Sequence, residues 1–249
     1  MRLGRFYFSE KNEFFYGIVD KEKVYKIESF ASKEYIEEYD LDVLEILPPS
    51  LPTKIVAIGL NYRDHAEEMK MHLPDEPLIF LKPSSSLLKH KGNIIYPSCS
   101  ERVDYEAELA VVIKKIAKNI TEREAKDYIL GYTAFNDVTA RDLQKKDGQW
   151  TRAKGFDTFS PVGPFIETEL ESSNLKIQTI LNGEVKQDSN TSNMIFDVFY
   201  IVSYVSKIMT LFPGDIIATG TPARIGPMNK GDTVVVRIQG LSELENYVV

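Results

Sequence analysis

The segment Pro48-Pro49-Ser50-Leu51-Pro52 places the strongest constraint on the secondary structure of this chain. A proline fixes its own φ and lacks the N–H group that helices and sheets use, so neither structure can continue through three prolines in five residues. We therefore expect a linker here. It divides the 249 residues into a small β-rich unit, residues 1–52 with the linker included, and a larger domain, residues 53–249.

Short apolar runs on both sides of the linker favour strands. Aromatic and β-branched runs separated by charged turns are typical of strands. Before the linker they cover residues 6–8, 14–19 and 23–27. After it, such runs predict strands at 54–59, 78–81, 131–136, 161–167, 175–181, 215–219 and 233–238.

Helices are fewer and are expected at the periphery. Polar residues predict one over 62–70, and apolar residues at helical spacing predict another over 193–211. Thr121 and Glu124 have the spacing of a capping box, which predicts a helix over 121–130. The fold class expected from these elements is α+β and predominantly β, a rolled sheet with peripheral helices.

The bulk composition excludes several classes of protein. A net charge of −7 provides no basic field for phosphates, which argues against a nucleic-acid partner. No run approaches the ~20 apolar residues that a membrane span needs. The single cysteine, Cys99, can form no internal disulfide, as is usual in a reducing compartment. We expect a cytoplasmic protein without a membrane partner.

Acidic residues alternate in Asp104-Tyr105-Glu106-Ala107-Glu108, directly before the apolar run 109–113. In a strand, alternate side chains point to the same face. Three carboxylates on one face repel each other unless a positive group lies among them, and a hard divalent cation prefers such oxygen ligands. Taken alone, however, this pattern is better explained by a solvated strand face.

Further polar groups follow other predicted strands. His65 and Glu68 are three residues apart, so a helix would place them on one face as a pair that could take a proton from water, or as an incidental surface pair. Asp137 could be a third oxygen ligand or a helix N-cap. Lys154 could bring an ammonium group to the acids or be solvated. Thr221 follows Gly220 in a loop that could hold a carboxylate or be a plain turn.

The joint occurrence of these motifs, in this order, resembles the fumarylacetoacetate hydrolase family over about residues 53–240. The resemblance rests on the sequences Gly-Leu-Asn-Tyr-Arg-Asp-His at 59–65, Asp-Tyr-Glu-Ala-Glu-Leu-Ala at 104–110, Phe-Asn-Asp-Val-Thr-Ala-Arg-Asp at 135–142, Ala-Lys-Gly-Phe-Asp at 153–157, Leu-Asn-Gly-Glu at 181–184 and Pro-Gly-Asp-Ile-Ile-Ala-Thr-Gly-Thr-Pro at 213–222.

The resemblance implies a mixed β-roll core, a homodimer and a site for Mg²⁺ or Mn²⁺, with Ca²⁺ able to replace them in crystals. The implied metal ligands are Glu106, Glu108 and Asp137, with Asp104 on the same face but outside the coordination sphere. Lys154 is implied beside the metal, and His65 and Glu68 as the pair that activates water. The implied contacts to the oxo-acid substrate come from Arg141, Gln144 and Thr221.

The activity expected from the resemblance is hydrolysis of a C–C bond in a small 2,4-dioxo acid, such as an acylpyruvate or fumarylpyruvate, through a metal-stabilised enolate. The same enolate supports two alternatives, isomerisation of 2-hydroxyhepta-2,4-diene-1,7-dioate and decarboxylation of an oxaloacetate-type acid. A non-catalytic binding module on the same scaffold is an alternative of another class. The charged segment 62–76, with Pro74 near its end, is expected to be a lid over the substrate.

Overall fold

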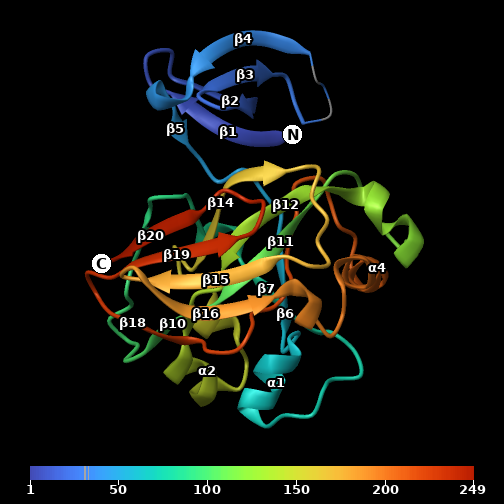
Figure 1. The fold of residues 1–249 in the computed structure, drawn as a ribbon, viewed down its shortest axis with the longest axis vertical. Helices are drawn as coiled ribbons and strands as arrows, with labels where there is room; N and C mark the ends of the chain where they lie inside the picture. The colour runs from blue at the N-terminus through green and yellow to red at the C-terminus, as the bar shows by residue number, and fades with distance from the viewer. Residues whose placement is uncertain (31, 33) are drawn as a thin grey trace.

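The N-terminal unit is a small antiparallel sheet. The computed structural model describes residues 1–30, 32 and 34–249. Its first strands are β1 (Arg2–Phe8), β2 (Glu13–Asp20), β3 (Lys23–Ile27), β4 (Tyr35–Asp40) and β5 (Glu45–Ile46), and a 3₁₀ turn, η1 (Leu41–Val43), precedes β5. These strands lie together at the top of Figure 1, above the rest of the molecule. The strands predicted at 6–8, 14–19 and 23–27 thus coincide with parts of β1, β2 and β3.

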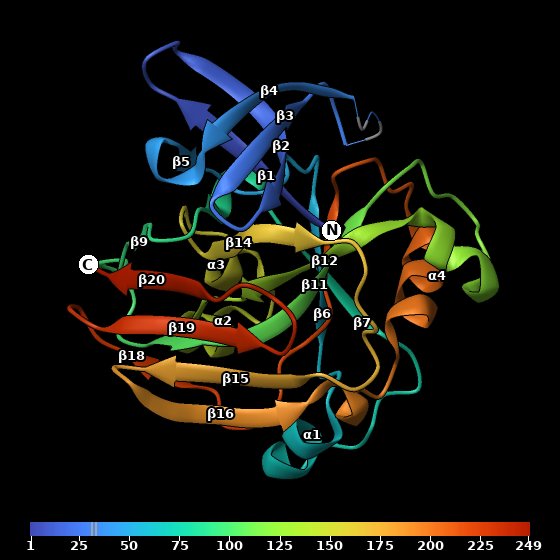
Figure 2. The same ribbon diagram turned by 45° about the horizontal axis from the view of Figure 1, so that its top comes forward.

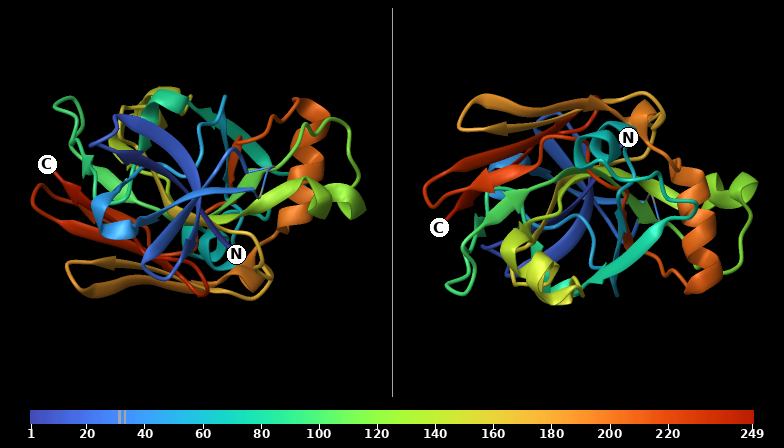
Figure 3. Two further views of the ribbon diagram at one scale, coloured as in Figure 1. Left: turned by 90° about the horizontal axis from the view of Figure 1, so that it is seen from above. Right: turned by 90° about the horizontal axis from the view of Figure 1, so that it is seen from below.

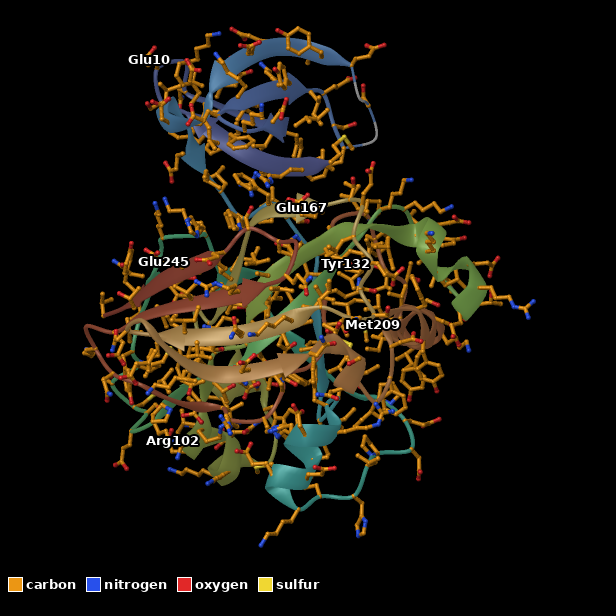
Figure 4. All side chains as sticks on the ribbon, viewed as in Figure 1. Glu10, Arg102, Tyr132, Glu167, Met209 and Glu245 are labelled. Atoms are coloured by element: carbon orange, nitrogen blue, oxygen red, sulfur yellow. The ribbon has the colours of Figure 1, made fainter. Side chains whose placement is uncertain are left out.

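The N-terminal unit joins the larger domain through β14 (Ser160–Glu167). Arg2 and Leu3 of β1 pair with Glu167 and Ile166, and the Arg2 Nε atom lies 2.8 Å from Glu167 Oε1. Figure 4 labels Glu167 at this junction. The pairing makes both units part of one 12-stranded sheet. The domain boundary at residue 52 stays a prediction.

The large sheet continues through the larger domain. After β14 come β12 (Ile129–Asn136), β11 (Ala107–Ile113), β17 (Ile216–Ala218), β6 (Ile55–Gly59) and β7 (Leu78–Lys82), while β8 (Leu87–Leu88) pairs with β14. Strand β11 is buried along its whole length. Leu109 and Val111 face one hydrophobic cluster, whereas Ala110 and Val112 face another. Both faces of this strand are covered, which explains its nearly continuous apolar sequence.

Two smaller sheets complete the β architecture. The 3-stranded sheet contains β13 (Thr139–Ala140), β10 (Val103–Tyr105) and β18 (Gly226–Met228). The 5-stranded sheet contains β16 (Glu184–Asn190), β15 (Lys176–Leu181), β19 (Thr233–Ile238), β20 (Leu244–Val248) and β9 (Asn93–Ile94). Figure 2 shows the 5-stranded sheet as a layer over β11 and β12, and Ile177 and Val236 belong to the same hydrophobic cluster as Leu109. The expected α+β, predominantly β fold is confirmed.

Short helices surround these sheets. They are α1 (Arg63–Met69), α2 (Arg141–Asp147), α3 (Thr151–Lys154) and α4 (Val198–Ile208), with 3₁₀ turns η2 (Ser84–Ser86), η3 (Glu122–Tyr128) and η4 (Thr191–Asn193). Figure 3 shows α1 and α2 at the end of the molecule that lies opposite the N-terminal unit. Within the described part of the chain, no helix combines the length and apolar character that crossing a membrane requires.

Two predicted helices differ from those observed. The capping box of Thr121 and Glu124 forms, but it starts a 3₁₀ helix, because Tyr128 already accepts a hydrogen bond from Lys114 and leads into β12. Helix α4 is shorter than residues 193–211. Asn61 accepts the N–H groups of Ile195 and Phe196, which keeps them extended, and the Asp197 side chain then caps the helix by accepting from Tyr200 N at 2.9 Å.

Candidate active site

Three buried carboxylates meet where β11 and β12 begin and end. Glu106 directly precedes β11, Glu108 lies within it, and Asp137 directly follows β12. The two strands are antiparallel, with Ala107 opposite Asn136, so these strand ends coincide. One oxygen of each carboxylate lies within 4.8 Å of the others. The structure therefore brings together the three predicted metal ligands.

The strand that carries the alternating acids is interrupted at Glu106, which differs from the expectation. Its N–H group donates to the Asn136 side chain at 2.9 Å, and its carbonyl accepts from Asp137 N at 2.9 Å. These bonds replace ordinary sheet pairing, so β10 belongs to the 3-stranded sheet and β11 to the 12-stranded sheet. Asp104 is thus on a different strand from Glu108.

Asp104 is fully buried and neutralised by two arginines. Its Oδ1 atom accepts from Arg102 Nε at 2.8 Å, and its Oδ2 atom accepts from Arg141 Nε at 2.9 Å. It is not part of the three-carboxylate cluster. This agrees with the expectation that Asp104 stands outside the ligand set, and it shows that Asp104 holds Arg141 in place.

Two buried lysines form ion pairs with Asp137, one with each carboxylate oxygen. Lys154 Nζ lies 2.5 Å from Asp137 Oδ2 and 2.9 Å from Glu106 Oε2. Lys82 Nζ lies 2.5 Å from Asp137 Oδ1 and also donates to the carbonyl of Phe159 at 2.7 Å. Lys154 was predicted beside the carboxylates, whereas Lys82 was missed. Its position at the end of the apolar run 78–81 was a weak signal, because it gives no indication of a partner.

The cations set the ionisation of the cluster. Burial alone would raise the pKa of Glu106, but Lys154 and Arg141 outweigh it and hold that pKa far below its usual range. Burial lowers the pKa of Lys154, yet Asp137 and Glu106 more than compensate and raise it. Burial lowers the pKa of Lys82 despite the nearby Asp137. Three cations, Lys82, Lys154 and Arg141, thus accompany the carboxylates.

Glu108 has the weakest compensation in the cluster. Burial and the neighbouring carboxylates of Asp137 and Glu106 raise its pKa well above the usual value. Its Oε2 atom accepts from Gly220 N at 2.8 Å. Gly220 has φ +99°, and a Cβ atom there would lie 2.7 Å from the Cβ of Asn61, so only glycine fits this approach.

His65 and Glu68 lie on the same face of α1, as predicted, but do not share a good hydrogen bond. His65 Nδ1 is 3.6 Å from Glu68 Oε2. Within the described residues this buried nitrogen has no hydrogen-bond partner. The Glu68 carboxylate is 42% exposed and accepts from Arg224 N at 2.8 Å. The two side chains are therefore neighbours without a hydrogen bond between them.

The carboxylates line a cavity of about 640 Å³. Of the other predicted residues, His65, Lys154, Arg141, Gln144 and Thr221 also border it. Arg141 contacts Glu106 and donates to Gln144 Oε1 at 2.6 Å. The remaining walls come from apolar groups and from the end of segment 62–76, including Met71, His72, Pro74 and Glu76. The lid function of that segment stays a prediction.

The donor set suits a hard divalent cation. All three groups are carboxylates, Mg²⁺ and Mn²⁺ prefer oxygen ligands, and a water-accessible cavity adjoins them. Asp137 does not cap a helix, because α2 begins after Ala140. Both observations favour the ligand interpretation over the solvated strand face and the helix cap that the sequence also allowed.

The comparisons with known proteins agree with this site. The model for the fumarylacetoacetate (FAA) hydrolase C-terminal domain matches residues 54–249. The chain is 42% identical to the 2-hydroxyhepta-2,4-diene-1,7-dioate isomerase from Mycobacterium marinum (TM-score 0.91, 100% of this chain and 98% of that chain). It is 40% identical to the 5-carboxymethyl-2-hydroxymuconate delta-isomerase from Mycobacterium smegmatis, with the same TM-score and coverage.

A third relative is also named for an isomerisation. Oxaloacetate tautomerase Fahd2a, mitochondrial, of Rattus norvegicus is 41% identical over 215 residues, 82% of this chain and 69% of that protein. The family match covers nearly all of the chain beyond the proline linker, and it includes every predicted site residue. This chain is a member of the fumarylacetoacetate hydrolase family.

Proposed function

We propose that the protein is a divalent-metal-dependent enzyme that forms the enolate of a small 2-oxo acid, and that it interconverts the keto and enol forms of an oxaloacetate-type dioate. The observation that carries this proposal is the buried cluster of Glu106, Glu108 and Asp137 on the cavity wall. A bound Mg²⁺ or Mn²⁺ would act as a Lewis acid that stabilises enolate charge.

The chain's own residues supply binding and proton transfer. Arg141 and Thr221 border the cavity and would hold the carboxylate of the acid. The Lys154 ammonium would stabilise negative charge on the enolate oxygen. His65 borders the same cavity, and its imidazole would carry a proton between carbon 3 and the oxygen on carbon 2, which interconverts the keto and enol forms. Apolar walls such as Phe80 and Trp150 would exclude water.

The named relatives support isomerisation of this kind. The rat protein is called an oxaloacetate tautomerase, and two solved relatives are called isomerases. Each name describes a rearrangement that an enolate intermediate allows without breaking a C–C bond. These names favour tautomerisation over hydrolysis, although hydrolysis was the first expectation from the motifs.

Hydrolysis of a 2,4-dioxo acid is the second candidate. It is favoured by the position of His65 Nδ1, 3.6 Å from Glu68 Oε2, which could close into a pair that activates water. Decarboxylation of oxaloacetate is a third reaction. It begins with the loss of CO₂, so it needs neither this pair nor removal of a proton from carbon 3. Product identity therefore separates the three reactions.

The test offers enol-oxaloacetate, acetylpyruvate, fumarylpyruvate and the dienedioate to the protein with Mg²⁺. We expect faster loss of the enol absorbance of oxaloacetate, with keto-oxaloacetate rather than pyruvate as the product. Glu106→Gln should abolish Mg²⁺ binding and turnover together, whereas Glu122→Gln, on the exposed face of η3, should change neither. If no substrate turned over, or if Glu106→Gln kept full activity, the proposal would be wrong.

We also propose that two copies form a homodimer. Strand β7 ends the order of the large sheet, and its Leu78 and Leu81 side chains are 48% and 47% exposed. An exposed apolar edge strand favours association. Light scattering of Leu81→Lys should show a shift toward monomer, and an unchanged mass at dilute concentrations would contradict the use of this edge.

A further inference from the structure

The Leu-Asn-Gly-Glu motif at 181–184 has no role in the chemistry above. It forms the tight turn between β15 and β16, in which Asn182 and Gly183 have φ of +52° and +82°. Such a two-residue turn sets the register of the two strands next to it. A register shift between Thr179 and Ile180 then brings Gln187, whose side chain is fully buried, opposite Thr179.

The surroundings of Gln187 determine which end of its amide faces which way. Its Oε1 atom accepts from the backbone N–H of Ala107 at 2.9 Å, and a backbone N–H can only donate. Its Nε2 atom donates to the carbonyl of Pro222 at 2.9 Å, and a carbonyl can only accept. A flipped amide would face both groups with the wrong atom, so the orientation is fixed.

This orientation decides what the Thr221 hydroxyl can do. The two hydrogens of Gln187 Nε2 have three acceptors in reach, the carbonyls of Pro222 at 2.9 Å and Ala223 at 3.3 Å and Thr221 Oγ1 at 3.0 Å. The two shorter bonds make the Thr221 hydroxyl an acceptor on that side. Within residues 1–30, 32 and 34–249, no group accepts the hydroxyl hydrogen of Thr221. Thr221 borders the cavity beside the carboxylate cluster. Its hydrogen is therefore available to an acceptor within the cavity.

The same amide reaches the metal-ligand strand. Ala107, whose N–H it receives, lies between Glu106 and Glu108. Gln187 therefore links the backbone between two carboxylates to the loop that carries Thr221. A rigid link of this kind pre-orients a binding group and lowers the entropy lost when a ligand binds.

We propose that Gln187 is a positioning residue that keeps the Thr221 hydroxyl as a hydrogen-bond donor to the acid bound in the cavity. This deepens the proposed function, because it rests on a 2-oxo acid as the ligand. Gln187 does not touch the ligand. It acts by occupying the acceptor side of Thr221, so that the hydroxyl hydrogen faces a carboxylate or oxo oxygen of the acid.

The decisive variant is Gln187→Glu, which keeps an oxygen for Ala107 N–H and replaces only the donating nitrogen. The new oxygen would accept the Thr221 hydrogen and remove it from the cavity. Calorimetry with oxalate on the Mg²⁺-loaded protein should show affinity reduced at least about tenfold, the usual size for a hydrogen bond to a charged group. Oxalate is titrated at saturating Mg²⁺ for both proteins, because the added negative charge itself changes the affinity for Mg²⁺. Gln187→Met replaces this variant if it does not fold.

A double-mutant cycle separates positioning from a general structural role. Thr221→Val should reduce oxalate affinity by a similar factor, and adding Gln187→Glu to it should cause little further loss, since both changes remove the same donor. Thr179→Val is the matched control. It removes a 2.6 Å bond to the oxygen end of the same amide and should leave oxalate affinity within about twofold.

Two failures are distinguishable. If the wild-type protein binds Mg²⁺ but no oxalate, the proposed function and this inference are both overturned. If wild-type protein binds oxalate and the losses from Gln187→Glu and Thr221→Val simply multiply, or Gln187→Glu has no effect, only the inference is overturned. Equal single losses with no added loss in the double variant support it.

Discussion

Lys82→Met is the change that most directly tests how the cluster is balanced. The Lys82 side chain is fully buried, and its ammonium contacts Asp137 and the carbonyl of Phe159. Methionine has a similar length and no charge, so it fills the space but removes one cation. The three carboxylates would then share two cations, Lys154 and Arg141.

The magnitude follows from the burial of the pair. Removing one partner of a buried ion pair typically costs about 3–5 kcal/mol, because the other charge stays desolvated. For a chain of this size each kcal/mol shifts the melting temperature by about 2–4 °C. The metal-free variant should therefore melt roughly 6–20 °C below the wild-type protein. Lys145→Met, at the exposed rim of the cavity, should cost less than about 0.5 kcal/mol.

Thermal unfolding with and without Mg²⁺ measures both parts of this prediction. A cation that binds only the folded state stabilises it by about 2.7 kcal/mol at 100 times its dissociation constant. Because the variant cluster has one positive group fewer to repel a cation, Mg²⁺ should raise its melting temperature more than that of the wild type. A metal-free Lys82→Met protein that melts within 2 °C of the wild type would refute the reasoning.

Three other outcomes are expected. Gly220→Ala should destabilise the protein more than Gly183→Ala, since both have positive φ but only Gly220 lacks room for a Cβ atom, and equal melting temperatures would contradict this. Burial and the neighbouring Lys91 lower the pKa of His90, whose Nδ1 accepts from Glu245 N. The free energy of unfolding should therefore fall as pH drops below about 6.5, because the unfolded chain binds the proton more readily. In denaturant titrations His90→Asn should flatten that pH dependence. Hydrogen exchange over residues 62–76 should slow when Mg²⁺ and oxalate bind, and equal protection would argue against a lid.

The carboxylate cluster could be predicted from the sequence because its members lie next to strand ends. Glu106, Glu108 and Asp137 each adjoin a long apolar run, and two antiparallel neighbours bring such ends together. The interruption at Glu106 could not be predicted, because it depends on the Asn136 side chain, which replaces a backbone partner. Alternation alone therefore placed Asp104 on the wrong strand.

Residues that act through distant partners were beyond sequence reasoning. Lys82 resembles any lysine at the end of a strand until the fold brings Asp137 within 2.5 Å, 55 positions along the chain. The role of Gln187 likewise depends on Ala107 and Thr221, which are distant from it in the sequence. Two-residue strands such as β8 and β13 have no periodicity of their own and exist only through their pairing. Residues 193–211 showed true helical spacing, but Asn61 determines where the helix begins.

The carboxylates stand where the chain passes between the 3-stranded and the 12-stranded sheet, from β10 to β11 at Glu106 and from β12 to β13 at Asp137. This location has a kinetic consequence. The ligand set exists only after both sheets have formed and docked, so binding energy from a cation is gained late in folding. Metal should then slow the unfolding of the protein strongly and speed its folding little. The concentration of metal would therefore affect how long the protein stays folded more than how fast it folds.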